Sequence, residues 1–120
     1  MNQEQILSDY NIEADDQGDS EKISRQLLDL ISRHDQEAFL SFYDRFKIPI
    51  YNFVFRLVQE HYGAEDITQE VFLAVWKGAH KFRGRSKVKT WIYRIAYYQS
   101  VSWYRHHPSI VNLEGVDDMP

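Results

Sequence analysis

The sequence predicts an all-α fold, a compact bundle of about four to five helices. Apolar residues recur three and four positions apart along most of residues 20–107, which places them on one face of a helix. We find no strand pattern and no internal repeat. The chain has 120 residues, of which 43% are hydrophobic and 15% aromatic, enough for one packed helical core but not for two.

Composition divides the chain into three segments. Residues 1–20 are polar and acidic and are expected to be mobile, although Ile6, Leu7, Tyr10 and Ile12 are spaced for a short helix. Residues 21–107 are expected to form the helical domain. Residues 108–120 are acidic again and are expected to begin an interdomain linker.

Two helices are expected between residue 20 and Pro49. Ser20 is a candidate N-cap for the first and Asp35 for the second. Their apolar faces would consist of Ile23, Leu27, Leu28, Leu30, Ile31, Ala38, Phe39, Phe42, Tyr43 and Phe46. Pro49 either kinks the second helix or opens the next one, because proline is tolerated in a first turn and is costly inside a helix.

The apolar stripe continues through Ile50, Phe53, Val54, Leu57 and Val58, and Gly63 is expected to end it. The next helix is expected to carry Glu65 and Asp66 in its first turn and to end near Gly78. Its buried stripe would consist of Ile67, Val71, Ala74 and Val75. Its opposite face would carry Asp66, Gln69, Glu70, Leu73 and Lys77. Leu73, apolar on a polar face, indicates a candidate protein-binding patch.

A connection over residues 79–87 follows, with Gly84 at its turn and Ser86 as the expected N-cap of a last helix that Pro108 ends. One stripe of this helix is expected in the core: Val88, Ile92, Ile95, Ala96, Gln99 and Trp103. A second stripe combines cations with rings: Lys87, Trp91, Arg94, Tyr98, Val101 and Arg105. We expect Trp103 to be buried and Tyr97 or Tyr98 to be exposed, and the sequence leaves Trp91 undecided.

Charge is strongly segregated along the chain. The formal net charge is −4, yet residues 71–113 contain eight Lys/Arg residues and no Asp or Glu. A basic segment of this kind favours a polyanion, because contacts with phosphates release counterions and drive association. A solvated basic face is the alternative, and the absence of any carboxylate in the segment favours nucleic acid over it.

Cations interleaved with aromatic rings suit single-stranded nucleic acid, whose bases stack on rings while the backbone contacts the cations. We also expect the start of the last helix to offer backbone N–H donors to phosphate. The candidate DNA-binding residues are Lys81, Arg83, Arg85, Ser86, Lys87, Lys89, Trp91, Arg94, Tyr97, Tyr98 and Arg105.

Several functional classes are not supported. The chain has no cysteine, its five histidines show no ligand spacing, and we expect neither a metal site nor a cofactor. No catalytic constellation is evident, so a binding domain is expected rather than an enzyme. The first thirty residues hold no signal-peptide pattern, and no apolar run is long enough to span a membrane. We therefore expect a cytoplasmic protein.

Three linked motifs carry a family resemblance. They are Asp66-Ile-Thr-Gln69-Glu70-Val71-Phe72-Leu73-Ala-Val-Trp76, Phe82-Arg83-Gly84 and Thr90-Trp91-Ile92-Tyr93-Arg94-Ile95-Ala96. In this order and spacing they closely resemble region 2 (the sigma-2 domain) of extracytoplasmic-function (ECF) sigma factors, bacterial transcription initiation subunits of the sigma-70 family. The resemblance covers about residues 22–107.

The resemblance implies two working surfaces. Asp66, Gln69, Glu70 and Leu73 would dock on the clamp helices of the RNA polymerase β′ subunit. The segment from Lys81 to Arg105 would bind the promoter −10 element, with a flipped non-template base captured in the loop. An anti-sigma factor is the further partner expected from the family. The region 4 domain of a complete ECF sigma factor has no counterpart in this chain.

Departures from the family pattern leave the promoter sequence preference open. Tyr98 and Ser102 stand where the family commonly has Asn and Asp, and the following run of arginines is reduced to Arg105-His106-His107. Two other readings stay open at this point. One is a protein-interaction module that mimics a sigma domain, and the other is a generic single-stranded nucleic-acid-binding domain.

Overall fold

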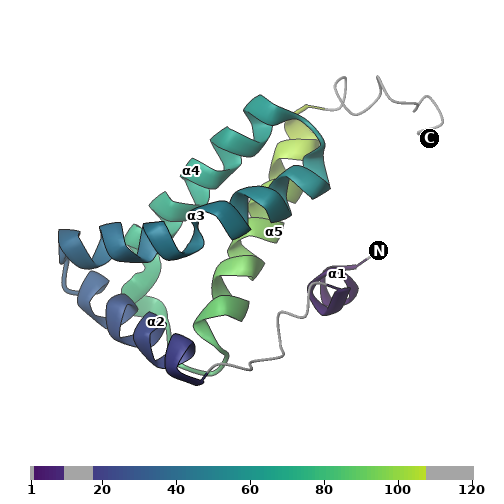
Figure 1. Ribbon diagram of the computed structural model, residues 1–120. Helices are drawn as coiled ribbons and strands as arrows, with labels where there is room; N and C mark the ends of the chain where they lie inside the picture. Colours follow the sequence, from purple (N-terminus) through teal and green to yellow (C-terminus); the bar gives the residue numbers. More distant parts are fainter. Residues whose placement is uncertain (1, 10–17, 108–120) are drawn as a thin grey trace.

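The computed structural model describes residues 2–9 and 18–107 and confirms the all-α fold (Figure 1). The described helices are α1 (Gln3–Asp9), α2 (Gly18–Ile31), α3 (Gln36–Val58), α4 (His61–Gly78), a 3₁₀ turn (Ala79–Lys81) and α5 (Val88–His106). No strand occurs in these two ranges.

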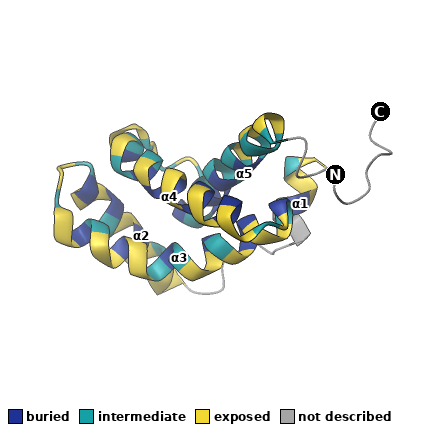
Figure 2. Cartoon of the chain, turned by 90° about the horizontal axis from the view of Figure 1, so that it is seen from above, coloured by how far each residue is buried: buried dark blue, intermediate teal, exposed yellow. Residues whose placement is uncertain are grey.

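Helix α5 connects the two ends of the bundle. Its start lies beside the start of α2, and its last turns reach the junction between α3 and α4 (Figure 1). At that end the Tyr104 hydroxyl donates to the carbonyl of Leu57, and burial raises the pKa of this phenol. The buried residues face the interior of the bundle and the exposed ones its outside (Figure 2).

Most of the predicted core residues are buried. The largest fully buried side chains are Leu28, Ile31, Phe42, Ile50, Phe53, Val54, Val71, Val75, Val88, Thr90 and Ile92. The cap prediction for α3 is also confirmed, because the Asp35 carboxylate accepts from the backbone N–H of Ala38 at 2.9 Å. Gly84 has φ of 75°, as a turn glycine should.

The short helix expected near the N-terminus is present in part. Ile6 and Leu7 lie on α1, whereas Tyr10 and Ile12 lie outside the described residues. Ile6 is 7% exposed and joins the core cluster, a packing role that the sequence did not predict.

Helix α2 begins at Gly18, so Ser20 lies within the first turn and is not the N-cap. Ser20 instead accepts hydrogen bonds from Arg45 of α3 through its hydroxyl (2.9 Å) and its carbonyl (3.3 Å).

Of the two alternatives for Pro49, the opening of a new helix is wrong, since α3 runs through the proline from Gln36 to Val58. Its neighbours Phe46 and Ile50 are buried, and the packing of this face keeps the helix continuous past the proline.

The expected stop at Gly63 was wrong, because Gln59 and Glu60 make the turn. Gln59 adopts the left-handed conformation, with φ of 58°, and ends α3. Glu60 caps α4, accepting from the N–H of Gly63 at 2.6 Å and of Tyr62 at 3.3 Å. Helix α4 therefore begins at His61, and Glu65 and Asp66 lie beyond its first turn.

Gly63 is a glycine because Trp103 packs on its backbone. A Cβ at this position would lie 2.4 Å from Cζ2 of Trp103. Trp103 is itself only half-buried, so the prediction that it is a core residue was wrong. It lies in the last turn of α5 and stacks on His107. The ring centroids of this pair are 4.3 Å apart.

The Gly63→Ala variant is expected to unfold with a free energy about 1–2 kcal/mol lower than the wild type, since overpacking costs about 1–3 kcal/mol and the gain in helix propensity offsets part of it. Urea titration followed by circular dichroism measures this change. Gly78→Ala is the control, because no atom lies within 4 Å of its added Cβ. Equal stability of the two variants would contradict the assignment of Gly63 to close packing.

Candidate functional site

The polar face of α4 is exposed as predicted. Asp66, Gln69 and Glu70 are exposed, and Leu73 on the same face is 44% exposed. These four residues, hereafter the α4 face, follow the i, i+3, i+4 and i+7 spacing of one side of a helix. Lys77 of the same helix is exposed as well.

A groove between α3 and α4 borders the α4 face, and Gln69 belongs to both. Its volume is about 300 Å³, and it is lined by Tyr43, Lys47, Ile48, Tyr51, Glu65, Thr68 and Gln69. Ile48 is 60% exposed on the α3 side. Sequence reasoning missed this contribution from α3, although Ile48 does not fit the buried stripe of that helix.

The basic surface consists of the loop 79–87 and the exposed side of α5. Lys81, Arg83 and Arg85 are exposed on the loop, whereas Lys87 and Lys89 at the start of α5 are half-buried. Arg105 is exposed near the end of α5, about 24 Å further along the helix axis from Lys89. The predicted residues thus form a track along α5, with most of the cations gathered at the loop end.

Of the three aromatic candidates, two are half-buried and one is exposed. Trp91 is half-buried and packs edge-on against Phe82, with ring centroids 5.5 Å apart. Tyr97 is half-buried, whereas Tyr98 is 60% exposed, as expected for one of this pair. The Tyr98 hydroxyl donates to Gln3 of α1 at 3.2 Å.

A pocket of about 340 Å³ opens between α2 and the loop. Its lining residues are Arg25, Leu28, Asp29, Ser32, Ala79, His80, Phe82, Arg83 and Gly84. The Arg25 guanidinium carbon lies 5.5 Å from the centre of the Phe82 ring, within the range of a cation–π contact. A Cβ on Gly84 would lie 3.0 Å from Arg25 Nη1, so the glycine serves both the turn and this close approach.

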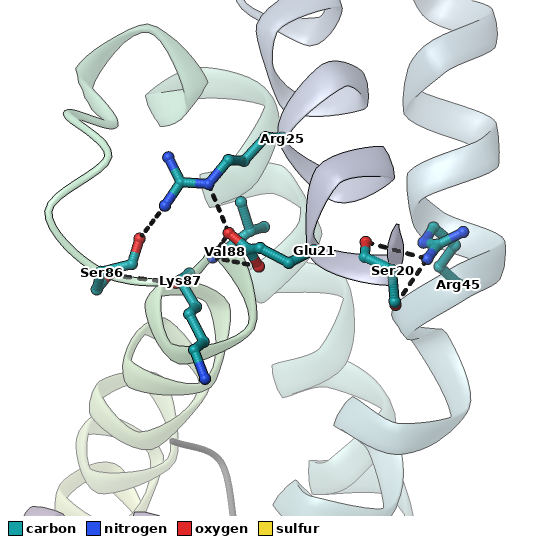
Figure 3. Close-up of polar contacts among 7 residues, drawn as sticks. All are labelled: Ser20, Glu21, Arg25, Arg45, Ser86, Lys87 and Val88. Atoms are coloured by element: carbon teal, nitrogen blue, oxygen red, sulfur yellow. Dashed lines mark hydrogen bonds and ion pairs between the residues drawn. The ribbon is translucent and has the colours of Figure 1, made fainter. Parts of the chain in front are cut away.

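Figure 3 shows how α2 fastens the start of α5. Both carboxylate oxygens of Glu21 accept from the Val88 backbone N–H, each at 3.1 Å. Arg25 Nε lies 2.7 Å from Glu21 Oε2, and Arg25 Nη2 donates to the Ser86 carbonyl at 3.1 Å.

This network corrects two predictions. Ser86 is not the N-cap of α5, because Lys87 occupies that position without a side-chain cap and Glu21 supplies the missing acceptor. The expected use of these backbone donors for phosphate is also wrong at Val88, whose N–H already binds a carboxylate. Arg25 and Glu21 were missed as members of the site because they come from α2, with no local signal in the sequence.

Among the residues that the structure describes, no group of three or more His, Cys, Asp or Glu could hold a metal ion. Within the same residues, no helix is long and apolar enough to cross a bilayer.

Comparison with known proteins matches the sequence of this chain to a family. The profile of Sigma-70 region 2 matches residues 42–108. The chain is 36% identical over 75 residues to the ECF RNA polymerase sigma factor SigX of Bacillus subtilis (strain 168), covering 62% of this chain and 39% of SigX. It is 34% identical over 80 residues to the ECF RNA polymerase sigma factor SigK of Mycobacterium bovis, covering 66% and 43%.

A third relative, the RNA polymerase sigma factor YlaC of Bacillus subtilis, is 35% identical over 63 residues, covering 52% of this chain and 36% of YlaC. The chain thus spans about two fifths of the length of these curated relatives. No solved structure matches significantly. The family profile covers more than half of the chain, and the chain therefore belongs to the sigma-70 region 2 family, as a region 2 domain of the ECF type.

Proposed function

We propose that this domain docks on the core of bacterial RNA polymerase through the α4 face and binds the promoter −10 element through its basic surface. The observation that carries this proposal is the separation of two chemically different surfaces on one small domain. The similarity of the chain to RNA polymerase sigma factors supports it. The function is non-enzymatic and is exercised in the cytoplasm, where the polymerase works.

The α4 face has the composition of a protein-docking patch. The exposed Leu73 lies among Asp66, Gln69 and Glu70, so an apolar centre is surrounded by a polar rim. Carboxylates on this rim suit a basic partner surface. The partner that we propose is the pair of clamp helices of the β′ subunit. The adjoining groove with the exposed Ile48 enlarges the apolar area that a partner helix could cover.

The basic surface has the composition of a single-strand binder. Exposed cations on the loop can neutralise successive phosphates, and the exposed ring of Tyr98 offers a base a stacking partner. The pocket beside Phe82 and Arg25 has an aromatic wall, cationic side chains and polar groups, which suit a planar base that has left the duplex.

Melting of the −10 element follows from binding of this kind. A surface that binds the unpaired non-template strand and not the duplex shifts the equilibrium towards the open form. Each captured base contributes stacking and hydrogen bonds that offset the cost of unpairing, which is a few kcal/mol per base. The domain therefore needs no chemical step to open DNA.

The docking surface is tested with an Asp66→Ala/Gln69→Ala variant. We expect its affinity for bacterial core RNA polymerase to fall at least tenfold, because the variant removes a carboxylate and an amide from the interface and a hydrogen bond to a charged group contributes about 1.5–3 kcal/mol. The measurement is the Kd by biolayer interferometry. Glu37→Ala/Gln26→Ala is the matched control, since it removes the same groups from exposed positions on α3 and α2. Equal affinities of the two double variants would refute docking through the α4 face.

The sequence left two alternatives to a sigma domain, a mimic of it and a generic nucleic-acid binder. They differ in which of the two surfaces they need. A mimic of a sigma domain needs the α4 face but not the basic loop, and a generic nucleic-acid binder needs the reverse. The sigma function requires two results together. Removal of the loop cations must abolish strand binding, and docking on the polymerase must depend on Asp66 and Gln69. This combination excludes both the mimic and the generic nucleic-acid binder. An anti-sigma factor, proposed by analogy with the family, would act by covering either surface.

A further inference from the structure

We propose that Glu21 and Arg25 of α2 are positioning residues for the strand-binding loop, which makes α2 a working part of the nucleic-acid site. This inference rests on the proposed binding of single-stranded DNA by the basic surface. Both residues lie outside residues 42–108, the part of the chain that the family profile matches.

Glu21 receives donors from two directions. It accepts the Val88 N–H with both oxygens and the Arg25 guanidinium at 2.7 Å, and its side chain is only 16% exposed. Only a carboxylate can accept on both oxygens, because the amide of a glutamine has one donor end. Glu21 therefore fixes the start of α5 relative to α2.

Arg25 fixes the other side of the loop. Its Nε binds Glu21 and its Nη2 binds the Ser86 carbonyl, while the guanidinium lies over the Phe82 ring. The loop residues between Phe82 and Ser86 include Arg83 and Arg85, two of the exposed cations. A planar fork that holds a backbone carbonyl and a ring on either side of this segment restricts where those cations can point.

The alternative is that both residues affect DNA only through their charge. In that case Glu21, a negative charge beside a basic surface, would weaken strand binding, and Arg25 would strengthen it as any cation does. Positioning and simple charge thus predict opposite signs for the removal of the Glu21 charge.

The experiment measures the affinity of the full chain for a fluorescein-labelled single-stranded oligonucleotide of mixed sequence over a range of salt concentrations. Glu21→Gln is expected to weaken binding about three- to tenfold with the slope of log K against log salt unchanged, because no phosphate contact is removed. Arg25→Lys is expected to bind as weakly as Arg25→Ala, since a lysine keeps the charge but not the fork.

Two controls isolate the network. Glu37→Gln removes the same charge from an exposed position on α3. Lys47→Ala breaks the Lys47–Asp44 pair of 3.7 Å, an i,i+3 ion pair within α3. Both are expected to bind nearly as tightly as the wild type. The loss of a negative charge would strengthen binding slightly, and the loss of a positive charge would weaken it slightly. Hydrogen exchange at the Val88 amide, measured without DNA, is expected to accelerate in Glu21→Gln only.

Unchanged or tighter binding of Glu21→Gln, or full recovery of affinity in Arg25→Lys, would overturn the positioning role. Absence of strand binding by the wild type would instead refute the nucleic-acid part of the proposed function, and the two failures are thereby distinguished. Should Glu21→Gln fail to fold, Arg25→Lys decides alone, because Arg25 is 42% exposed and its replacement leaves the core intact.

Discussion

The Phe53→Ala variant is expected to lose about 3–5 kcal/mol of unfolding free energy, a large part of the 5–15 kcal/mol typical of a small domain. Phe53 is 1% exposed and packs edge-on against Tyr93 of α5, with ring centroids 4.9 Å apart. Its removal leaves a cavity between α3 and α5, the helix that carries most of the aromatic candidates. The loss is measured from urea unfolding followed by circular dichroism.

Phe55 on the same helix provides the matched control. It is 39% exposed and stacks on Tyr51 at 6.1 Å between ring centroids. Phe55→Ala removes the same group without opening a closed cavity, so a loss below about 1 kcal/mol is expected. Comparable losses in the two variants would show that α3 and α5 are not joined through Phe53.

Replacement of Lys81, Arg83 and Arg85 by alanine is expected to reduce the affinity for single-stranded DNA about a hundredfold or more at 50 mM salt. The three cations are exposed on the loop. If each contacts one phosphate, the slope of log K against log salt should fall by about 2, since a single strand contributes about 0.7 per contact. Fluorescence anisotropy between 50 mM and 300 mM salt measures both quantities.

The control removes the same charge from elsewhere. Arg33 in the turn after α2 is replaced by alanine together with Lys47 and Arg56 of α3, which changes the net charge equally. A small uniform loss with an unchanged salt slope is expected, because only long-range attraction is reduced. A slope that falls equally in both triple variants would mean that binding depends on net charge and not on the loop.

Helix positions and their exposed sides could be predicted from the sequence because both depend on neighbours three and four positions apart. The α4 face is the clearest case. Asp66, Gln69, Glu70 and Leu73 are exposed since Ile67, Val71 and Val75 occupy the buried side of the same helix. The charge segregation is likewise a property of the linear sequence, and so is the turn at Gly84.

Contacts between distant segments were decided only by the tertiary structure. Glu21 caps a helix that begins 67 positions later, and no local rule associates it with Val88. The role of Gly63 was misjudged for the same reason. A glycine after an apolar stripe resembles a helix stop, yet here it admits the indole of Trp103, 40 positions away in the sequence. Side-chain periodicity and charge act locally, and they were enough to predict the helical character of the chain, the polar face of α4 and the basic character of α5, but not where each helix begins. Only packing decided how α2 holds the loop and closes the pocket, since those contacts exist once the helices have met.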